Sequence, residues 1–408
     1  MFDVKSVDEA LTIIENNFKD YKLDYELTSI DEANERILCQ DIISEEDIPS
    51  FNRSTVDGYA VIASDTFGVS DAIPAQLNII GEIKMGEKPS FVLKQGETCY
   101  IPTGGELPSN ADGIVMIEYT ENFDDGDVFI SKACSPGNNV VYKGDDVVIG
   151  AKVIGSGTLL KPQDIGLLAA LGYSEVKVKK KLRVGIISTG DEIIGISEKP
   201  IGSQVRDVNS YSLYAIVQTS FTTPVFYGIV PDDYNTLKEV VEKATVECDI
   251  VLISGGSSVG QKDVTSDVID SLGYPGVLVH GIAVKPGKPT IIGKIGEKAV
   301  VGLPGHPASA FVVCNIFITH LINTMLGISK RSIPKVNGEM ASNYPSNTGR
   351  EEYLPVRVEK EHDRTIIYPV YGKSSLISIL SKSNGYIHIS RGSEGLNKGQ
   401  LKEVVLWK

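Results

Sequence analysis

The middle of the chain alternates strand-like runs of valine, isoleucine and leucine with segments whose apolar residues recur at helical spacing. The strand-like runs are LRVGIIST, PVFYGIV, DIVLISGG and AVVGLPG. This alternation is typical of a mostly parallel sheet with helices covering both of its faces. We therefore expect a multidomain α/β protein whose α/β domain spans residues 181–328. Ligands of such domains bind at the carboxyl ends of the strands.

The segments before this domain show different residue patterns. Short β-prone runs such as YAVIA and GIVMIEY, separated by turn-forming residues, predict a β-rich insertion domain over residues 50–146. Helical spacing then returns in KPQDIGLLAALGYSEV. We expect residues 1–49 and 147–180 to form one split helical domain around that insertion.

Two capping boxes support the helical interpretation of the N-terminal segment. Ser6 with Glu9, and Ser29 with Glu32, each have the spacing at which the two residues satisfy each other's backbone N–H groups at a helix start. At the other end of the chain the helical patterns stop, and runs such as EEYLPVRV and TIIYPVYG predict an all-β unit over residues 332–408.

The charge balance restricts the class of ligand. The chain has 39 basic and 53 acidic residues and a net charge of −14. Such a balance works against a broad surface for nucleic acid or for an anionic membrane, so we expect neither partner. Any anion must bind locally, in a pocket.

The cysteines and the apolar segments indicate a cytoplasmic protein. The five cysteines show no paired spacing, which predicts reduced thiols without disulfides or structural zinc. The N-terminus lacks the cationic-then-apolar plan of a signal peptide. One membrane-like run, PASAFVVCNIFITHLINTMLGI, contains asparagine, threonine and histidine, so a buried helix is the better interpretation.

Four loops with glycine or acidic residues follow strands of the predicted α/β domain. They are STGDEI, SGGSSVGQKD, VKPGKP and GLPGHPASA. A loop such as SGGSSVG can turn its backbone N–H groups toward a phosphate at a helix N-terminus, although each loop alone could be a tight connection. Their coincidence at strand ends favours a ligand site. The candidate phosphate-binding residues are Ser254, Gly255, Gly256, Ser257, Ser258, Pro304 and Gly305.

The loop VKPGKP carries two cations in a stiff turn. Its prolines restrict the backbone beside Lys285 and Lys288, so both ammonium groups could meet one ligand with little ordering entropy to lose. A solvated turn is the alternative interpretation.

Acidic residues in the neighbouring loops indicate a metal ion. Carboxylates beside lysines at a phosphate site usually mean hydrated magnesium. Asp191 lies in the same loop as Glu192, and Asp232 in PDDYNTL also fits an ordinary helix N-cap. The predicted Mg²⁺ ligands are Glu192, Asp232 and Asp263.

These segments together resemble the molybdopterin molybdenumtransferase family of molybdenum cofactor synthesis, to which the C-terminal region of gephyrin is related. FNRSTVDGYAV is similar to the family's Ser-x-Met-Asp-Gly-Tyr-Ala segment. IPTGGELPSNADGIVMIE, LLAALGYSEVKV and the four loops match further segments in the expected order. The resemblance covers essentially the whole chain. It implies a molybdopterin-binding α/β domain, a C-terminal β-barrel over residues 332–408 and an elongated homodimer.

The resemblance also implies roles for individual residues. In the family, the β insertion reaches the partner subunit's active site, and here it contains Asp57 and Thr103. The implied catalytic residues are Asp57, Glu192, Asp263, Lys285 and Lys288. The further implied substrate-binding residues are Thr103, Asp146, Arg350, Ser374 and Ser375.

Three positions depart from the family pattern. Val56 replaces the usual methionine, and His306 replaces the asparagine of Gly-Leu-Pro-Gly-Asn-Pro. Where the family commonly has arginines before Gly144, Lys143 is the only cation, and a lysine cannot make the bidentate contact of a guanidinium.

The implied activity is insertion of molybdenum from molybdate into adenylylated molybdopterin, with cleavage of the pyrophosphate bond and release of AMP. Two alternatives remain open: a non-catalytic molybdopterin-binding scaffold, and a molybdopterin adenylyltransferase that acts one step earlier. If the chain is the molybdenumtransferase, such an adenylyltransferase is an expected upstream partner. The sequence does not separate molybdate from tungstate, since the two anions share charge and nearly share size.

Overall fold

The computed structural model describes residues 4–122, 126–255, 264–328 and 334–407. These residues form two compact units. Unit 1 consists of Met1–Leu27, Asn34–Cys39 and Lys177–Lys408, and unit 2 of Thr28–Ala33 and Gln40–Val176. The sequence grouped residues 1–49 with 147–180, whereas in the structure the first 27 residues belong with the α/β part of the chain.

Unit 1 is built on a six-stranded, mostly parallel sheet, which confirms the predicted fold class. The strand order is β16-β13-β17-β21-β20-β18. Neighbouring strands are parallel from β16 to β21, while β20 and β18 are antiparallel to their neighbours. The strands are β13 (Leu182–Thr189), β16 (Thr222–Val230), β17 (Ile250–Ser254), β18 (Pro275–His280), β20 (Ile291–Ile295) and β21 (Lys298–Leu303). The central strand β17 is buried along its whole length, as its apolar sequence predicts.

Helices follow the strands as expected. They are α3 (Asn209–Val217), α4 (Tyr234–Glu247), α5 (Val264–Leu272), and a long apolar helix composed of α6 (Pro307–Val313), a π-helical turn η4 (Cys314–Ile318) and α7 (Thr319–Leu326). Two short strands, β14 (Ile193–Ile194) and β15 (Val205–Arg206), pair between β13 and α3.

The long helix Pro307–Leu326 is the one helix of the described residues that is long and apolar enough to cross a membrane. In its most apolar window 61% of the residues are buried inside the protein. Buried Phe317, Leu321 and Met325 face the neighbouring elements, so this helix packs as a core helix does.

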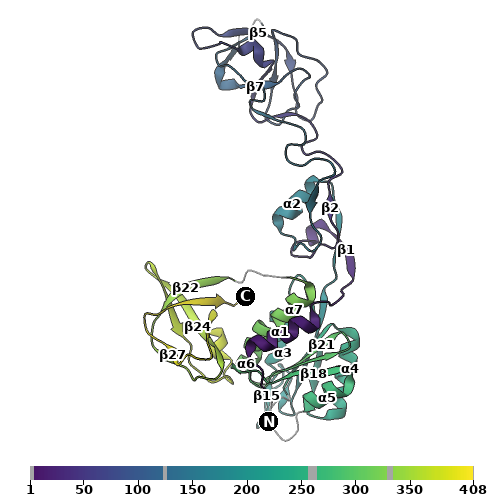
Figure 1. Cartoon of the computed structure of the whole chain (residues 1–408), viewed down its shortest axis with the longest axis vertical. Coiled ribbons are helices and arrows are strands. Elements are labelled where there is room, and N and C mark those ends of the chain that lie inside the picture. Colours follow the sequence, from purple (N-terminus) through teal and green to yellow (C-terminus); the bar gives the residue numbers. More distant parts are fainter. Residues whose placement is uncertain (1–3, 123–125, 256–263, 329–333, 408) are drawn as a thin grey trace. The chain divides into compact units, whose positions relative to one another are not determined.

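The first helix, α1 (Val7–Phe18), lies against α7 (Figure 1). Its start confirms the first capping box: the Glu9 N–H donates to Ser6 Oγ at 3.2 Å, and the Ser6 N–H donates to Glu9 Oε2 at 2.7 Å. Its buried side chains are Val7, Ala10, Ile14 and Phe18.

The second predicted capping box is wrong. Ser29 ends a strand, β1 (Tyr25–Ser29), and is followed only by one 3₁₀ turn, η1 (Ile30–Glu32), without a side-chain cap. β1 pairs with β12 (Glu175–Lys179). Pairing with a strand distant in sequence therefore overrides the local helix signal.

The C-terminal strands of unit 1 form a closed β-barrel. The ring runs β24-β25-β22-β28-β26 and returns to β24. Its strands are β22 (Lys335–Met340), β24 (Glu351–Glu361), β25 (Arg364–Pro369), β26 (Gly385–Ile389) and β28 (Leu401–Leu406), and the smaller elements are β23 (Tyr344–Pro345), β27 (Gly395–Leu396) and α8 (Ser378–Ser381). Buried Leu354, Val356, Ile387 and Val404 belong to its core.

A short strand of the lysine-bearing segment joins this barrel. β19 (Val284–Lys285) is parallel to β24, with Val284 opposite Glu351 and Lys285 opposite Glu352. The α/β part of unit 1 and the barrel are thus connected by backbone hydrogen bonding at the lysine turn.

Unit 2 contains a six-stranded sheet with the order β7-β4-β6-β5-β9-β8. Its strands are β4 (Gly58–Val61), β5 (Ala75–Glu82), β6 (Glu97–Ile101), β7 (Gly113–Met116), β8 (Thr120–Asn122) and β9 (Asp127–Ile130). The predicted helix is present as α2 (Pro162–Ala170). The remaining elements are β2 (Ile42–Ile43), β3 (Arg53–Ser54), β10 (Val140–Val141), β11 (Lys152–Ile154), η2 (Ala63–Thr66) and η3 (Ile117–Tyr119).

Candidate functional site

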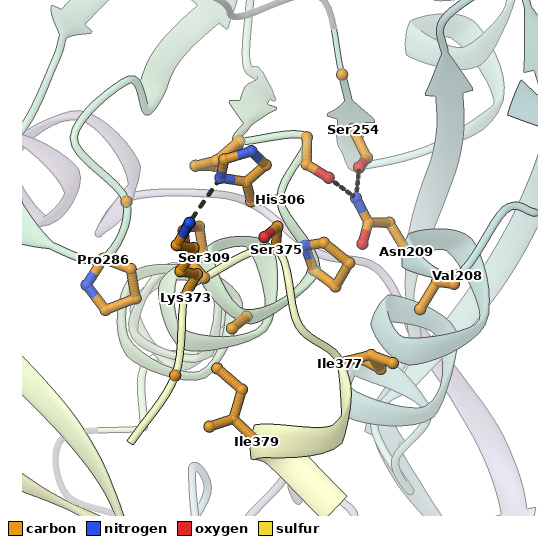
Figure 2. Close-up of a pocket in the computed structure, with 18 of the residues that line it drawn as sticks. Val208, Asn209, Ser254, Pro286, His306, Ser309, Lys373, Ser375, Ile377 and Ile379 are labelled. Carbon is orange, nitrogen blue, oxygen red and sulfur yellow. Dashed lines mark hydrogen bonds between the residues drawn. The ribbon is translucent and has the colours of Figure 1, made fainter. Parts of the chain in front are cut away.

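A cavity of about 1310 Å³ lies in unit 1 at the carboxyl ends of the parallel strands. Its walls include Thr189 at the end of β13, Gly255 after β17 and Gly305 after β21. Barrel residues such as Arg350 and Ser374 complete the wall. A position beyond the strand ends is the usual ligand site of an open α/β sheet. Figure 2 shows side chains of both parts converging on this space.

The structure brings most of the predicted unit 1 residues to this cavity. Its lining includes Glu192, Asp232, Ser254, Gly255, Lys285, Lys288, Pro304, Gly305, Arg350, Ser374 and Ser375. Four further candidates lie outside the described residues: Gly256, Ser257, Ser258 and Asp263.

The two lysines of the turn have different environments. Lys285 Nζ lies 2.9 Å from Glu352 Oε1, and the Lys285 side chain is 44% exposed. Lys288 is exposed and makes no ion pair with any residue that the structure describes. Hydrogen bonds within the turn hold its shape: Thr290 Oγ1 donates to the Gly287 carbonyl at 2.6 Å, and the Ile282 N–H donates to the Lys288 carbonyl at 2.9 Å.

Glu352 is a buried carboxylate in the cavity wall that the sequence analysis did not single out. It is 4% exposed and accepts a hydrogen bond from Tyr344 Oη at 2.7 Å, another from Ser346 Oγ, and the ion pair from Lys285. Two glutamates occur together in GREEY, and adjacent strand residues point to opposite faces. The sequence alone does not say which of the pair faces the cavity.

Asn209 links two loops of the cavity. Its Nδ2 donates to Ser254 Oγ at 2.7 Å and to the Gly305 carbonyl at 2.8 Å, as the dashed lines in Figure 2 indicate. Its buried Oδ1 has no hydrogen-bond partner among the described residues. The alternating pattern of the sequence predicts a helix after β13 but does not mark Asn209, its first residue, as a site residue.

Asp207 is a second buried polar residue in the lining of the cavity. Asp207 accepts hydrogen bonds from Ser188 Oγ at 2.8 Å and from the Ser210 N–H at 3.1 Å. These bonds join the end of β13 to the start of α3. The Asp207 carboxylate and the Asn209 amide nitrogen are therefore both fixed by hydrogen bonds at this side of the cavity.

Close backbone packing connects the first two loops of the cavity. Gly255 has φ of +115°, and a Cβ added there would lie 2.0 Å from the Thr189 carbonyl oxygen. Glycine is required at this position because no side chain fits between the loops.

The carboxylates at the strand ends, Glu192 and Asp232, have no ion-pair partner among the residues that the structure describes. Asp232 Oδ1 accepts from Thr189 Oγ1 at 2.6 Å, while the neighbouring Asp233 is the residue that caps α4, through the Thr236 N–H at 2.9 Å. The N-cap alternative for Asp232 is therefore wrong. Glu192 also lines the cavity. Within the described ranges, no group of three or more His, Cys, Asp or Glu side chains is arranged to hold a metal ion.

Three predicted site residues lie in unit 2. Asp57 Oδ1 accepts a hydrogen bond from the Thr103 N–H at 2.8 Å, so two residues that are distant in sequence meet there. Asp146 is exposed, and its N–H donates to the Ile48 carbonyl at 3.0 Å.

Comparison with known proteins places all of these residues within one protein family. Residues 5–172 match the MoeA N-terminal region (domain I and II), residues 185–324 a probable molybdopterin binding domain, and residues 337–407 the MoeA C-terminal region (domain IV). A putative molybdopterin biosynthesis protein of Methanocaldococcus jannaschii is 37% identical over 92% of this chain and 91% of its own. The chain belongs to the MoeA family.

Further MoeA relatives agree with this assignment. A molybdopterin molybdenumtransferase of Nostoc is 34% identical over 76% of this chain and 72% of its own. The crystal structure of a MoeA protein from Pyrococcus horikoshii is 36% identical, covers 100% of both chains and has a TM-score of 0.84. The family predicted from the ordered motifs is therefore confirmed.

The departures from the MoeA pattern have distinct surroundings. His306 is the N-cap residue of α6, but its side chain makes no cap hydrogen bond, and its Nδ1 lies 3.0 Å from Ser374 Oγ of the barrel segment. Lys143 Nζ lies 3.4 Å from Asp47 Oδ2, so a carboxylate already accompanies its charge. Val56 packs as a partly buried side chain in the core of the unit 2 sheet.

Proposed function

We propose that this chain inserts molybdenum into adenylylated molybdopterin. In this reaction the pyrophosphate bond is cleaved, AMP leaves, and molybdenum from molybdate is placed on the dithiolene sulfurs of the pterin. The MoeA family membership and the relatives named molybdopterin molybdenumtransferase support this proposal. The observation that carries it is the cavity of about 1310 Å³ in which the lysine turn, the acidic loops and the barrel residues meet.

Both reactants are anions, so the cavity must offset their mutual repulsion. In a partly enclosed site, fixed cations and hydrogen-bond donors stabilise developing negative charge without having to reorganise. Lys288 and Arg350 provide cations for molybdate, and Ser374 and Ser375 provide hydroxyl groups. We assign the loops after β17 and β21, joined by Asn209, to the phosphates of the pterin substrate.

The carboxylates of the cavity fit a magnesium ion. Mg²⁺ keeps several waters and needs only one or two protein carboxylates when a substrate supplies phosphate oxygens. Glu192 and Asp232 would hold it, and both line the same cavity. Asp263, the third proposed ligand, lies outside the described residues. When bound, Mg²⁺ neutralises phosphate charge and stabilises the leaving group.

We further propose that the enzyme is a cytoplasmic homodimer whose active site takes residues from both subunits. Asp57 and Thr103 already meet in unit 2, whereas the lysines and carboxylates lie in unit 1. In this proposal, unit 2 of one subunit serves the cavity of the other, and an upstream adenylyltransferase supplies the adenylylated substrate.

The two alternative functions, a scaffold and an adenylyltransferase, explain fewer of the residues that line the cavity. A scaffold would not require a buried carboxylate, two lysines and two acidic residues around one cavity. An adenylyltransferase would have no use for the barrel residues Arg350 and Ser374, which line the same cavity.

One assay separates the three functions. The purified protein is incubated with adenylylated molybdopterin, Mg²⁺ and molybdate, and both AMP and active molybdenum cofactor are measured. We expect both products, in equal amounts, and we expect chelation of Mg²⁺ to abolish them. Binding without AMP release would identify a scaffold, while formation of adenylylated molybdopterin from ATP and molybdopterin would identify the earlier enzyme. Repeating the assay with tungstate establishes the preferred oxyanion.

A further inference from the structure

A carboxylate in the wall of an anion-binding cavity needs a physical reason, because it repels the ligand. Glu352 is such a group: it is almost fully buried, lines the cavity and lies opposite Lys285 in the β19–β24 pairing. Burying a charge is unfavourable unless partners compensate it. The reason must therefore lie in the groups that Glu352 contacts.

Those groups form a complete shell around the carboxylate. Oε1 accepts from Tyr344 Oη at 2.7 Å and from Lys285 Nζ at 2.9 Å, and Oε2 accepts from Ser346 Oγ. Burial and the hydrogen bond to Glu352 raise the pKa of Tyr344 above its ordinary value, so this hydroxyl keeps its proton and remains a donor. Two hydroxyl groups thus fix the carboxylate, and the carboxylate in turn fixes the ammonium group.

The consequence is a difference between the two lysines of the turn. The charge of Lys285 is compensated by Glu352, and the remaining N–H groups of its ammonium have a defined direction. Lys288 is exposed, has no carboxylate partner among the described residues and so retains its full charge for an anion.

We propose that Glu352 is a positioning residue that holds Lys285 as a directed hydrogen-bond donor for the transition state, while Lys288 provides the charge that attracts the oxyanion. This inference rests on the proposed function of the same cavity. It predicts that Glu352 matters for turnover and opposes, rather than supports, the binding of molybdate.

The test is Glu352→Gln, which preserves the size of the side chain and an acceptor for the hydroxyl groups but removes the charge. We expect the turnover number for AMP release to fall on the order of 10²-fold, as for a displaced catalytic group. The affinity for molybdate alone, measured by calorimetry without the pterin substrate, should stay constant or increase, because one repelling charge is gone. A purely structural role would lower both turnover and affinity.

Glu351→Gln is the matched control. Glu351 is the preceding residue of the same strand and accepts from His388 Nε2 at 2.7 Å, but it does not line the cavity. Removing its charge should change neither quantity. If Glu352→Gln turns over as fast as Glu351→Gln, or if its affinity for molybdate falls together with turnover, the positioning role is wrong.

Coupling between the two residues gives an independent check. Lys285→Met should reproduce the turnover loss, and the double variant Lys285→Met/Glu352→Gln should be no slower than either single variant, since both changes remove one interaction. Additive losses would contradict the proposal. Should Glu352→Gln not fold, Tyr344→Phe removes one hydroxyl that fixes the carboxylate, and it must slow turnover without weakening molybdate binding.

The assay separates failure of this inference from failure of the proposed function. If the unmodified protein releases no AMP with molybdate, the proposed function is wrong. If it releases AMP and the variants behave like the control, only the role of Glu352 is wrong.

Discussion

Lys288 is the side chain whose substitution we expect to have the clearest effect on anion binding. It lines the cavity, is exposed and has no ion pair with a described residue, so its whole charge is available to a ligand. It also lines a neighbouring cavity of about 290 Å³, together with Arg350 and Arg391. Three cations and one carboxylate, that of Glu9, therefore line this corner of a chain with a net charge of −14.

We predict that Lys288→Ala weakens the use of molybdate. Loss of one charge-assisted hydrogen bond costs roughly 1.5–3 kcal/mol, which is about one to two decades in affinity. The concentration of molybdate at half-maximal AMP release should rise by that factor. Lys335→Ala is the control, since Lys335 pairs with Glu403 on the barrel and lies outside the cavity. An unchanged molybdate dependence in folded Lys288→Ala protein would remove Lys288 from the site.

At the residue scale, the sequence predicted those site residues that lie in recognisable loops after strands. Lys285, Asp232 and Gly255 were found because polar loops after apolar strands meet at one end of a parallel sheet. Arg350 and Ser374 came only through the family resemblance, because their approach depends on how the barrel packs. Glu352 and Asn209 were missed, since burial of a polar side chain is set by tertiary packing rather than by its neighbours in sequence.

Among the elements, the packing of α1 against α7 contains a titratable contact. His320 on α7 lies with Nε2 3.3 Å from Glu15 Oε1 on α1. Burial lowers the pKa of His320 below its ordinary value of 6.5, although the Glu15 carboxylate acts in the opposite direction. The folded state therefore binds the proton less readily than the unfolded state does.

This contact predicts a loss of stability in acid. Above the pKa that His320 has in the unfolded chain, the imidazole is neutral in both states and does not change the free energy of unfolding. As the pH drops through about 6.5 toward the lower pKa of the folded state, the unfolded chain binds the proton first, so the free energy of unfolding decreases. The melting temperature of His320→Gln should thus decrease less than that of the unmodified protein between about pH 7.5 and 5.5. His362→Asn, in the exposed turn between β24 and β25, is the control. Parallel melting curves for the unmodified and His320→Gln proteins would exclude the effect.

The elements themselves were largely predictable, and the failures have a common cause. The strands of the α/β sheet and α1 follow from apolar periodicity and from the capping box of Ser6 and Glu9. The capping box predicted at Ser29 was wrong because β1 pairs with β12, which is more than a hundred residues away in the sequence. A local pattern contains no information about such a pairing.

For the whole molecule, the capping box of Ser6 and Glu9 predicted α1 but not the surface on which this helix packs. The sequence grouped it with residues 147–180, whereas it packs on α7 in unit 1. The proposed sharing of the active site between subunits is a question of the same scale, because Asp57 and Lys288 belong to different units.

We predict that two inactive variants regain enzymatic activity when their subunits are mixed. Asp57→Ala and Lys288→Ala are mixed under conditions of subunit exchange, at a molybdate concentration too low for Lys288→Ala to turn over. Random exchange places both lesions in one of the two sites of each hybrid, so about a quarter of the unmodified activity should return. Exchange is verified with differently tagged subunits. Verified hybrids without activity would show that each subunit works with its own Asp57.

The pairing of β19 with β24 also orders events during synthesis of the chain. Domains generally form as the ribosome releases them, from the N-terminus onward. The strands β13, β16, β17 and β21 are all complete before Glu351, the first residue of β24, has been made. The turn that holds Lys285 and Lys288 therefore cannot pair with β24 until all four of these strands have been synthesised. A chain that ends before β24 lacks the strand that pairs with β19 and also lacks barrel residues such as Glu352 and Ser374, so it cannot form the cavity described above.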